Sequence, residues 1–156
     1  MAIKALGINA NDEVIVTPRT FIASVSSVCN VGAIPIFADV DPDSGNITAD
    51  SISKVISKKT KAIICVHLGG WPCNMGPIMK LAKKNKIKVI EDCSQAHGAM
   101  YKGKSVGTYG DISTWSFCQD KIITTGGEGG MVTTNNKSYW NVMWSFKDHG
   151  KSYTSV

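Results

Sequence analysis

The sequence predicts an α/β fold, with a three-layer, mostly parallel sheet that has helices on both faces. Short runs that are apolar on both faces alternate along the chain with helical segments of about ten residues, the pattern of βαβ units. The 156 residues are the length of about one domain, and 43% are hydrophobic against 19% charged, so the chain can bury a core. No run approaches the ~18–20 apolar residues of a membrane helix, so no membrane partner is expected.

Turn and cap residues separate the predicted elements. Thr17-Pro18 ends the first apolar run, Gly32 closes the helix after it, and Thr48 or Asp50 can cap a later helix that runs to about Ser57. The predicted strands are Glu13–Val16, Ile34–Val40, Lys61–His67, Ile87–Asp92, Ile112–Phe117 and Gly130–Thr134. The other predicted helices are Phe21–Asn30, Met75–Asn85 and Lys137–Asp148, and Asp41–Asn46 is a turn.

Side chains with a chemical use stand just after several of these strands. In an open parallel sheet, ligands bind in the crevice at the carboxyl ends of the strands. The residues of interest at these ends are Phe21, His67, Asp92, Ser116 and Lys121. We therefore look for the functional site among them.

Each of these residues has a structural interpretation beside the functional one. Asp92 either caps a short helical turn over Ser94–Gly98 or holds a cationic ring nitrogen. Lys121 is either an ordinary surface lysine or, beside a desolvated crevice, an amine whose pKa is lowered and that acts as a nucleophile. Phe21 is either core filler or part of the site, and His67 either faces a substrate or is a satisfied buried group.

The glycine-rich run Thr124–Gly130, TTGGEGG, is not a nucleotide-binding fingerprint. Met131 and Val132 stand where G-x-G-x-x-G would require glycine, and no GKS or GKT follows. The plain interpretation of this run is a tight turn or a hairpin. Glycines here would also let the backbone come close to a ligand.

The net charge of +5 makes a nucleic-acid partner worth weighing. Only Arg19 among the 17 basic residues is an arginine, whereas sites that read bases or clamp phosphates usually use the arginine fork. The densest run, Lys80–Lys88, is typical of the solvated face of an amphipathic helix. We therefore expect no specific nucleic-acid partner.

The five cysteines are an odd number without a C-x-x-C pair, and the first residues lack the apolar segment of a signal peptide. We expect reduced thiols and a cytoplasmic protein. A zinc site of Cys65, His67, Cys73 and Cys93 can be drawn, but C-x-H is not a usual zinc spacing, so no metal is predicted.

Several ordered segments of the chain resemble one family. They are DEVIVTPRTFIAS, IPIFADVDPDSGNI, KAIICVHLGGWPCNM, the long run EDCSQAHGAMYKGKSVGTYGDISTWSFCQDKIITTGGEGGMVTT, and FKDHG. In order and spacing, the chain from about Asp12 to Gly150 resembles the nucleotide-sugar aminotransferases of the DegT/DnrJ/StrS type.

The resemblance implies a pyridoxal-phosphate enzyme with the aspartate-aminotransferase-like fold, fold type I of these transferases. Lys121 would form the Schiff base with the aldehyde of pyridoxal 5'-phosphate, and Asp92 would pair with the pyridinium nitrogen. Gln95 would lie against the cofactor ring or its hydroxyl, Ser116 would donate its hydroxyl to the phosphate, and Phe21 would stack on the other face of the ring. Relatives that are sugar dehydratases carry histidine at the position of Lys121, so the lysine favours transamination.

The implied reaction moves an amino group from an amino acid, by family expectation glutamate, to a nucleotide-linked keto-sugar in polysaccharide or antibiotic sugar biosynthesis. Family members are typically homodimers, and they are much longer than this chain. The resemblance therefore implies that residues 1–156 are a fragment, a partial pyridoxal-phosphate-binding large domain. The alternatives are a non-catalytic remnant or interaction module of the same fold, and a relative of the sugar dehydratases.

Overall fold

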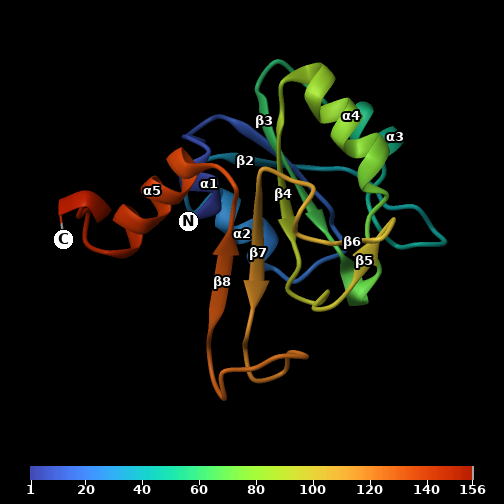
Figure 1. The fold of residues 1–156 in the computed structure, drawn as a ribbon. Coiled ribbons are helices and arrows are strands. Elements are labelled where there is room, and N and C mark those ends of the chain that lie inside the picture. The colour runs from blue at the N-terminus through green and yellow to red at the C-terminus, as the bar shows by residue number, and fades with distance from the viewer. Residues whose placement is uncertain (156) are drawn as a thin grey trace.

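The computed structural model describes residues 1–155, which are built around a six-stranded sheet (Figure 1). In spatial order the strands are β2 (Ile34–Phe37), β1 (Glu13–Val16), β3 (Thr60–Val66), β4 (Lys88–Asp92), β7 (Ile112–Ser116) and β8 (Gly130–Thr133). The first five run parallel to one another, and β8 pairs antiparallel with β7. A separate small hairpin, β5 (Met100–Tyr101) with β6 (Lys104–Ser105), follows β4 in the chain.

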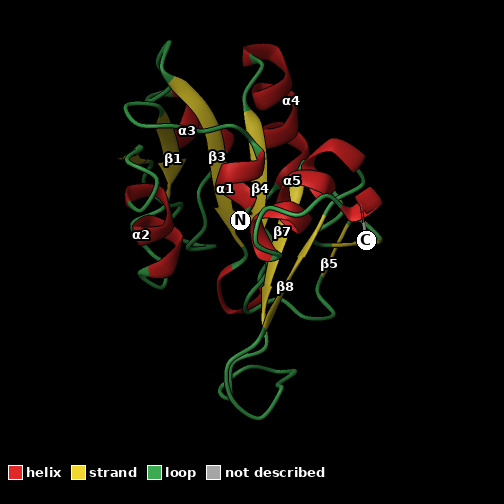
Figure 2. Cartoon of the chain, turned by 90° about the vertical axis from the view of Figure 1, so that its left-hand side faces the viewer, coloured by secondary structure: helices red, strands yellow, loops and turns green. Residues whose placement is uncertain are grey.

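Helices cover both faces of this sheet. They are α1 (Ala2–Ala5), α2 (Ala23–Cys29), α3 (Ala49–Ser53), α4 (Met75–Asn85) and α5 (Lys137–Lys147), and a short 3₁₀ turn covers Tyr153–Ser155. Figure 1 shows α3 and α4 on one side of the strands and α1, α2 and α5 on the other. In Figure 2, α1 and α5 lie in front of the strands. The predicted three-layer, mostly parallel α/β fold is therefore confirmed.

Alternate residues of the central strands enter two separate cores. Ile63 of β3 and Val89 of β4 pack on the side of α3 and α4. Their neighbours Ile64 and Ile90 pack on the side of α1, α2 and α5. Since successive side chains of a strand point to opposite faces, a sheet covered on both faces requires apolar residues in succession. This requirement explains the continuous apolar runs of the sequence.

Most predicted elements are present, with small differences at their ends. The strands and α4 lie where the sequence predicts them. Thr48 caps α3 through a capping box, in which Ser51 N–H donates to Thr48 Oγ1 at 3.1 Å and Thr48 N–H donates to Ser51 Oγ at 3.1 Å. The helix ends at Ser53, earlier than predicted, because the chain turns toward β3. There the N–H of Ser57 donates to Thr60 Oγ1 at 2.9 Å rather than to a helical carbonyl.

The glycine-rich run belongs to a hairpin, as its plain interpretation predicts. Residues 117–129 join β7 to β8 as a loop that projects from the lower end of the sheet in Figure 1. At its base, Phe117 N–H donates to the carbonyl of Gly129 at 2.7 Å. Gly130 leaves no room for a side chain, because a Cβ there would lie 2.8 Å from the carbonyl oxygen of Trp115. This close pairing holds Lys121 just beyond the end of β7.

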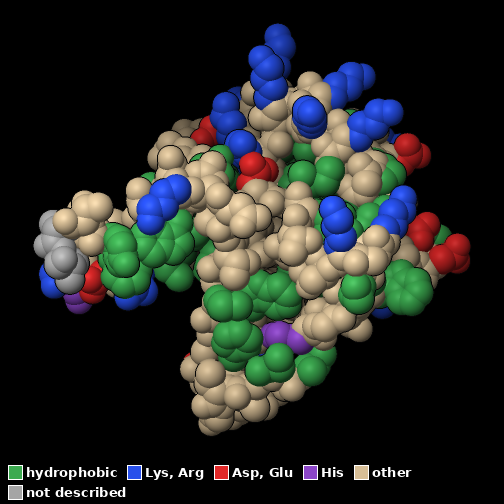
Figure 3. All heavy atoms as spheres, viewed as in Figure 1, with side chains coloured by type: hydrophobic (Ala, Val, Ile, Leu, Met, Phe, Trp, Pro, Cys, Tyr) green, Lys and Arg blue, Asp and Glu red, His purple; other side chains and the backbone are tan. Residues whose placement is uncertain are grey.

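Basic side chains gather at the α4 end of the face seen in Figure 3, away from the 117–129 loop. Lys80, Lys83 and Lys84 are exposed, and Lys88 pairs with Asp111 at 2.9 Å. The lysine run is therefore the solvated helix face that its spacing predicts. Among the described residues, no helix combines the length and apolar character needed to cross a membrane.

Candidate active site

A cavity of about 650 Å³ opens at the carboxyl ends of β1, β4 and β7. Five residues that the sequence singles out line it together: Phe21, Asp92, Gln95, Ser116 and Lys121. They come from three segments that are far apart in the sequence. The amine of Lys121 and the carboxylate of Asp92 therefore border the same space, at the edge of the sheet where α/β proteins bind ligands.

Asp92 is the last residue of β4, and two serines hold its carboxylate. Oδ1 accepts hydrogen bonds from Ser94 N–H at 3.1 Å and from Ser94 Oγ at 2.6 Å. Oδ2 accepts a hydrogen bond from Oγ of Ser24, in α2, at 2.8 Å. The residues after Asp92 form turns and not a helix, so the helix-capping interpretation is wrong and the side chain closes an Asx turn instead. The carboxylate is held firmly at the cavity wall.

Lys121 lies in the 117–129 loop beside an acidic neighbour. Its Nζ is 2.9 Å from the carboxylate of Asp120, and 20% of its side chain is exposed. The hydrogen bond from Lys121 to Asp120 raises the pKa of the amine above its ordinary value, against a smaller lowering by burial. The expectation of a lowered pKa is therefore wrong. To act as a nucleophile, Nζ must first give up a proton and leave Asp120.

Phe21 and Ser116 approach the cavity from different strands. Phe21 follows β1 and is 72% exposed, which excludes the core-filler interpretation. Ser116 ends β7, and its Oγ accepts a long hydrogen bond from Cys118 N–H at 3.4 Å. That contact does not use the hydroxyl hydrogen, which is available as a donor. The cavity thus combines an aromatic ring and a hydroxyl with the amine and carboxylate.

Gln95 presents its amide in a defined orientation. Its Oε1 accepts a hydrogen bond from the N–H of Gly69 at 2.7 Å. Because a backbone N–H can only donate, the oxygen of the amide must face Gly69, and the NH₂ group faces the other way. Gly69 belongs to a short 3₁₀ turn, η1 (Leu68–Gly70), directly after β3, and its φ of 60° suits glycine.

His67 and Glu91 form a fully buried pair beneath this turn. His67 Nε2 lies 3.0 Å from Glu91 Oε2, and His67 Nδ1 accepts a hydrogen bond from Cys73 N–H at 3.1 Å. Both ring nitrogens are therefore occupied inside the protein. Of the two interpretations of His67, the contacts match the satisfied buried group and not a residue that faces a substrate.

Two of the four residues of the zinc site considered from the sequence, His67 and Cys93, lie together with Glu91. The ligand atoms of His67, Glu91 and Cys93 lie within 4.8 Å of one another. However, Glu91 accepts four hydrogen bonds, from His67 and from the backbone N–H groups of residues 107, 109 and 110, at 2.6–3.0 Å. The lone pairs that a metal would need are already engaged, which favours a hydrogen-bonded cluster over a metal centre.

Glu91 makes the stability of the fold depend on pH. Burial raises the pKa of Glu91, but hydrogen bonds from His67 and from the N–H groups of Gly110 and Gly107 outweigh it and hold the pKa below its ordinary value of 4.5. Such a carboxyl stabilises the fold above its unfolded pKa, and this stabilisation is lost as the pH falls through the folded pKa. We expect the free energy of unfolding to fall less steeply below pH 4.5 in Glu91→Gln than in the unaltered chain.

Urea denaturation at a series of pH values between about 7 and 3 measures this difference. Glu128→Gln changes an exposed glutamate and serves as the control, since it should follow the unaltered chain. Parallel pH curves for Glu91→Gln and the unaltered chain would contradict the role of Glu91.

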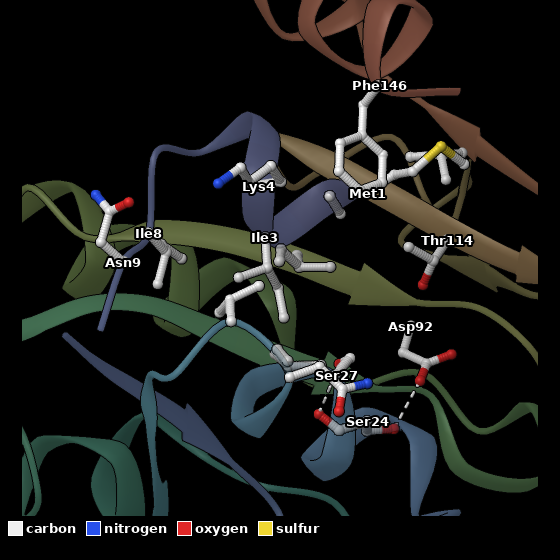
Figure 4. Close-up of a pocket in the computed structure, with 16 residues that line it drawn as sticks. Met1, Ile3, Lys4, Ile8, Asn9, Ser24, Ser27, Asp92, Thr114 and Phe146 are labelled. Atoms are coloured by element: carbon white, nitrogen blue, oxygen red, sulfur yellow. Dashed lines mark hydrogen bonds between the residues drawn. The ribbon is translucent and has the colours of Figure 1, made fainter. Parts of the chain in front are cut away.

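A second cavity, of about 620 Å³, lies on the other side of Asp92 and extends toward α1 and α5 (Figure 4). Met1, Ile3 and Phe146 are among its lining residues. Ser24 and Asp92 border both cavities, and the hydrogen bond between them is drawn in Figure 4. The other four predicted residues line only the first cavity, so the chemically useful groups converge there.

The chain is similar to known aminotransferases in sequence and structure. A family model described as the DegT/DnrJ/EryC1/StrS aminotransferase family matches residues 1–155. A GDP-perosamine synthase of Escherichia coli O157:H7 is 52% identical over 150 residues, which are 96% of this chain and 41% of that protein. The solved structure of an aminotransferase from Psychrobacter cryohalolentis is 66% identical with a TM-score of 0.98, over 99% of this chain and 39% of that one.

A further solved structure, NtdA from Bacillus subtilis with bound cofactor PMP, is 35% identical with a TM-score of 0.91, over 99% of this chain and 34% of that one. These likenesses confirm the predicted aminotransferase fold. The chain spans about two fifths of the length of the curated relatives it matches.

Proposed function

Because the chain belongs to the DegT/DnrJ/EryC1/StrS aminotransferase family, we propose that its cavity binds pyridoxal 5'-phosphate and serves the transfer of an amino group from an amino acid to a nucleotide-linked keto-sugar. The observation that carries the proposal is the meeting of Lys121 and Asp92 in one cavity. The name of the GDP-perosamine synthase relative and the PMP bound to NtdA support the substrate class and the cofactor. Glutamate is the expected amino donor.

The cavity suits the cofactor in its chemistry. Lys121 carries the primary amine that an aldehyde requires, and Asp92 carries the carboxylate that a pyridinium nitrogen requires. The hydroxyl hydrogen of Ser116 is available for a phosphate oxygen, and the exposed ring of Phe21 offers a stacking surface. When bound, pyridoxal phosphate supplies an electron sink for the carbon that loses or gains the amino group.

Asp92 would hold the proton of the ring nitrogen of a bound cofactor in place. A hydrogen bond between a cation and a carboxylate favours the protonated ring. The hydrogen bonds from Ser24 and Ser94 fix the carboxylate at the end of β4, so it does not need to be reoriented when the ligand enters. Because Asp92 ends β4, the strand would set the position of the ring nitrogen of a bound cofactor.

Lys121 performs two tasks through one atom. Once the proton held beside Asp120 has left, the neutral Nζ would hold the cofactor by condensing with its aldehyde, with the release of water. As a free amine in the substrate complex, Nζ would accept the proton that the substrate carbon loses and would give it to the cofactor carbon that carried the aldehyde. Lys121, in the 117–129 loop, is one of the residues that line the cavity.

Titration with pyridoxal phosphate tests the proposal. We expect saturable binding with a change in the cofactor absorbance, and borohydride reduction should fix about one cofactor per chain onto Lys121, as located by peptide mass spectrometry. A chain that neither binds the cofactor at millimolar concentration nor is labelled at Lys121 would contradict the proposal. That result would favour the non-catalytic module of the same fold.

Asp92→Asn tests the role of the carboxylate. The amide cannot pair with a cationic ring nitrogen as strongly as the carboxylate does, and hydrogen bonds to charged groups contribute about 1.5–3 kcal/mol. We expect the affinity for pyridoxal phosphate, measured by absorbance titration, to fall about tenfold. The exposed Asp43→Asn is the control and should bind as the unaltered chain does. If Asp92→Asn binds pyridoxal phosphate with unchanged affinity, Asp92 does not take part in cofactor binding.

A further inference from the structure

The buried pair of His67 and Glu91 has no task in the transfer chemistry described above. Burying a histidine and a glutamate in a sheet is costly unless every polar atom is hydrogen-bonded. Here each of these atoms has a partner, because Glu91 accepts four hydrogen bonds and both ring nitrogens of His67 are bonded. Because the network is complete, we looked for the part of the chain that this pair holds in place.

His67 joins three parts of the chain at the carboxyl edge of the sheet. Its backbone N–H donates to the carbonyl of Asp92 at 3.1 Å, and its ring contacts Glu91, the residue before Asp92. On the other side, Nδ1 accepts from Cys73 N–H, so the ring proton lies on Nε2 and is donated to Glu91. The histidine therefore ties the end of β3 both to β4 and to residue 73.

The segment closed by these contacts is the turn η1. His67 directly precedes the turn and Cys73 lies three residues after it. The carbonyl of His67 accepts from the N–H of Gly70 at 3.2 Å. Within the turn, Gly69 donates its N–H to Gln95 Oε1 at 2.7 Å. A Cβ at Gly70 would lie 3.1 Å from the backbone oxygen of Gln95, so the turn lies directly against this residue.

We propose that the His67–Glu91 pair positions Gln95 through the turn η1. The family resemblance places the amide of Gln95 against the ring or the hydroxyl of the cofactor, and the pair would hold this amide at the cavity. This inference rests on the proposed function for the identity of the ligand. It makes His67 and Glu91 positioning residues, which do not touch the ligand. It also explains why a fully buried histidine stands at the end of a strand that borders the site.

Hydrogen exchange in the ligand-free chain tests the first half of the proposal. His67→Phe keeps a planar ring and removes both ring hydrogen bonds. We expect the amide of Gly69 to exchange about tenfold faster in this variant, while the amide of Ile63 in β3 changes less than about twofold. His149→Phe, at an exposed histidine, is the control and should change neither amide. Unchanged exchange at Gly69 in His67→Phe would overturn the positioning role.

The milder His67→Gln covers the case in which His67→Phe fails to fold. Its amide can still donate to Glu91 but does not replace the acceptor for Cys73, so Gly69 should again exchange faster than in the unaltered chain. Gln95→Ala removes the acceptor for the N–H of Gly69 directly and sets the size of the full effect. If His67→Gln folds and Gly69 stays as protected as before, the proposal fails.

Cofactor affinity tests the second half through a double-mutant cycle. We expect His67→Phe to weaken the binding of pyridoxal phosphate about tenfold in the unaltered chain and less than about twofold when Gln95 is already alanine. Equal losses in both backgrounds would mean that His67 acts on the fold in general, which overturns the proposal. If the unaltered chain binds no cofactor, the proposed function fails, and the exchange experiment still decides whether His67 positions Gln95.

Discussion

Lys121→Ala is expected to abolish the covalent fixation of pyridoxal phosphate, lowering borohydride-dependent labelling at least about a hundredfold. A methyl group cannot attack an aldehyde, and neither Asp92, Gln95 nor Ser116 offers an amine in its place. The substitution removes one ion pair with Asp120, whose side chain is 67% exposed, so it should hardly affect the stability of the fold. Reduction with borohydride followed by peptide mass spectrometry measures the labelled fraction and its position.

Other lysines of the chain provide the control for this experiment. Lys83→Ala alters an exposed residue of α4, at the other end of the molecule, and should leave the labelling of Lys121 unchanged. Because free aldehydes react slowly with any lysine, the label must be mapped and not only counted. Labelling of the same extent in Lys121→Ala, at another residue that lines the cavity, would show that the anchoring amine has been misassigned.

Glu91→Ala is expected to lower the free energy of unfolding by about 3–5 kcal/mol. The substitution leaves the buried Nε2–H of His67 and three backbone N–H groups of the half-buried 107–110 loop without their acceptor. It also opens a small space between β4 and that loop. Urea denaturation at pH 7 measures the loss, since the midpoint and slope give the free energy directly.

Glu128→Ala removes an exposed glutamate and should change the free energy of unfolding by less than about 0.5 kcal/mol. A loss below about 1 kcal/mol in Glu91→Ala would contradict the importance given to this network. Glu91→Gln should lie between the two, because its amide oxygen still accepts some of the hydrogen bonds.

The sequence predicted the sheet and its helices well because their signals are long and repeated. The helix Met75–Asn85 has an apolar stripe that includes Ile78 and Ala82, and both side chains are buried. Strands of two residues, as in β5 and β6, and a helix of four, as in α1, are too short to show any period. An apolar run also looks the same in either direction, so periodicity alone did not reveal that β8 runs antiparallel to β7.

For the site, the carboxyl-end rule and the family resemblance together named the five cavity residues. The partners of these residues were missed, because they depend on contacts across long stretches of chain. Ser24 reaches Asp92 only when the start of α2 lies at the carboxyl end of β4, and Gly69 reaches Gln95 only when η1 lies against it. The raised pKa of Lys121, in contrast, could have been predicted from the sequence. The acidic residue that causes it, Asp120, is adjacent to Lys121 in the chain.

The tip of the β5–β6 hairpin, Lys102-Gly103, is exposed. In the sequence it lies after three of the five cavity residues and before the other two. A protein divided at this tip would carry Phe21, Asp92 and Gln95 on one piece and the remaining two on the other. Backbone breaks are tolerated best at such exposed turns. The absorbance of a bound vitamin B6 ligand would then report whether the two pieces have reassembled. Neither piece alone carries both the lysine and the aspartate of the proposed binding site.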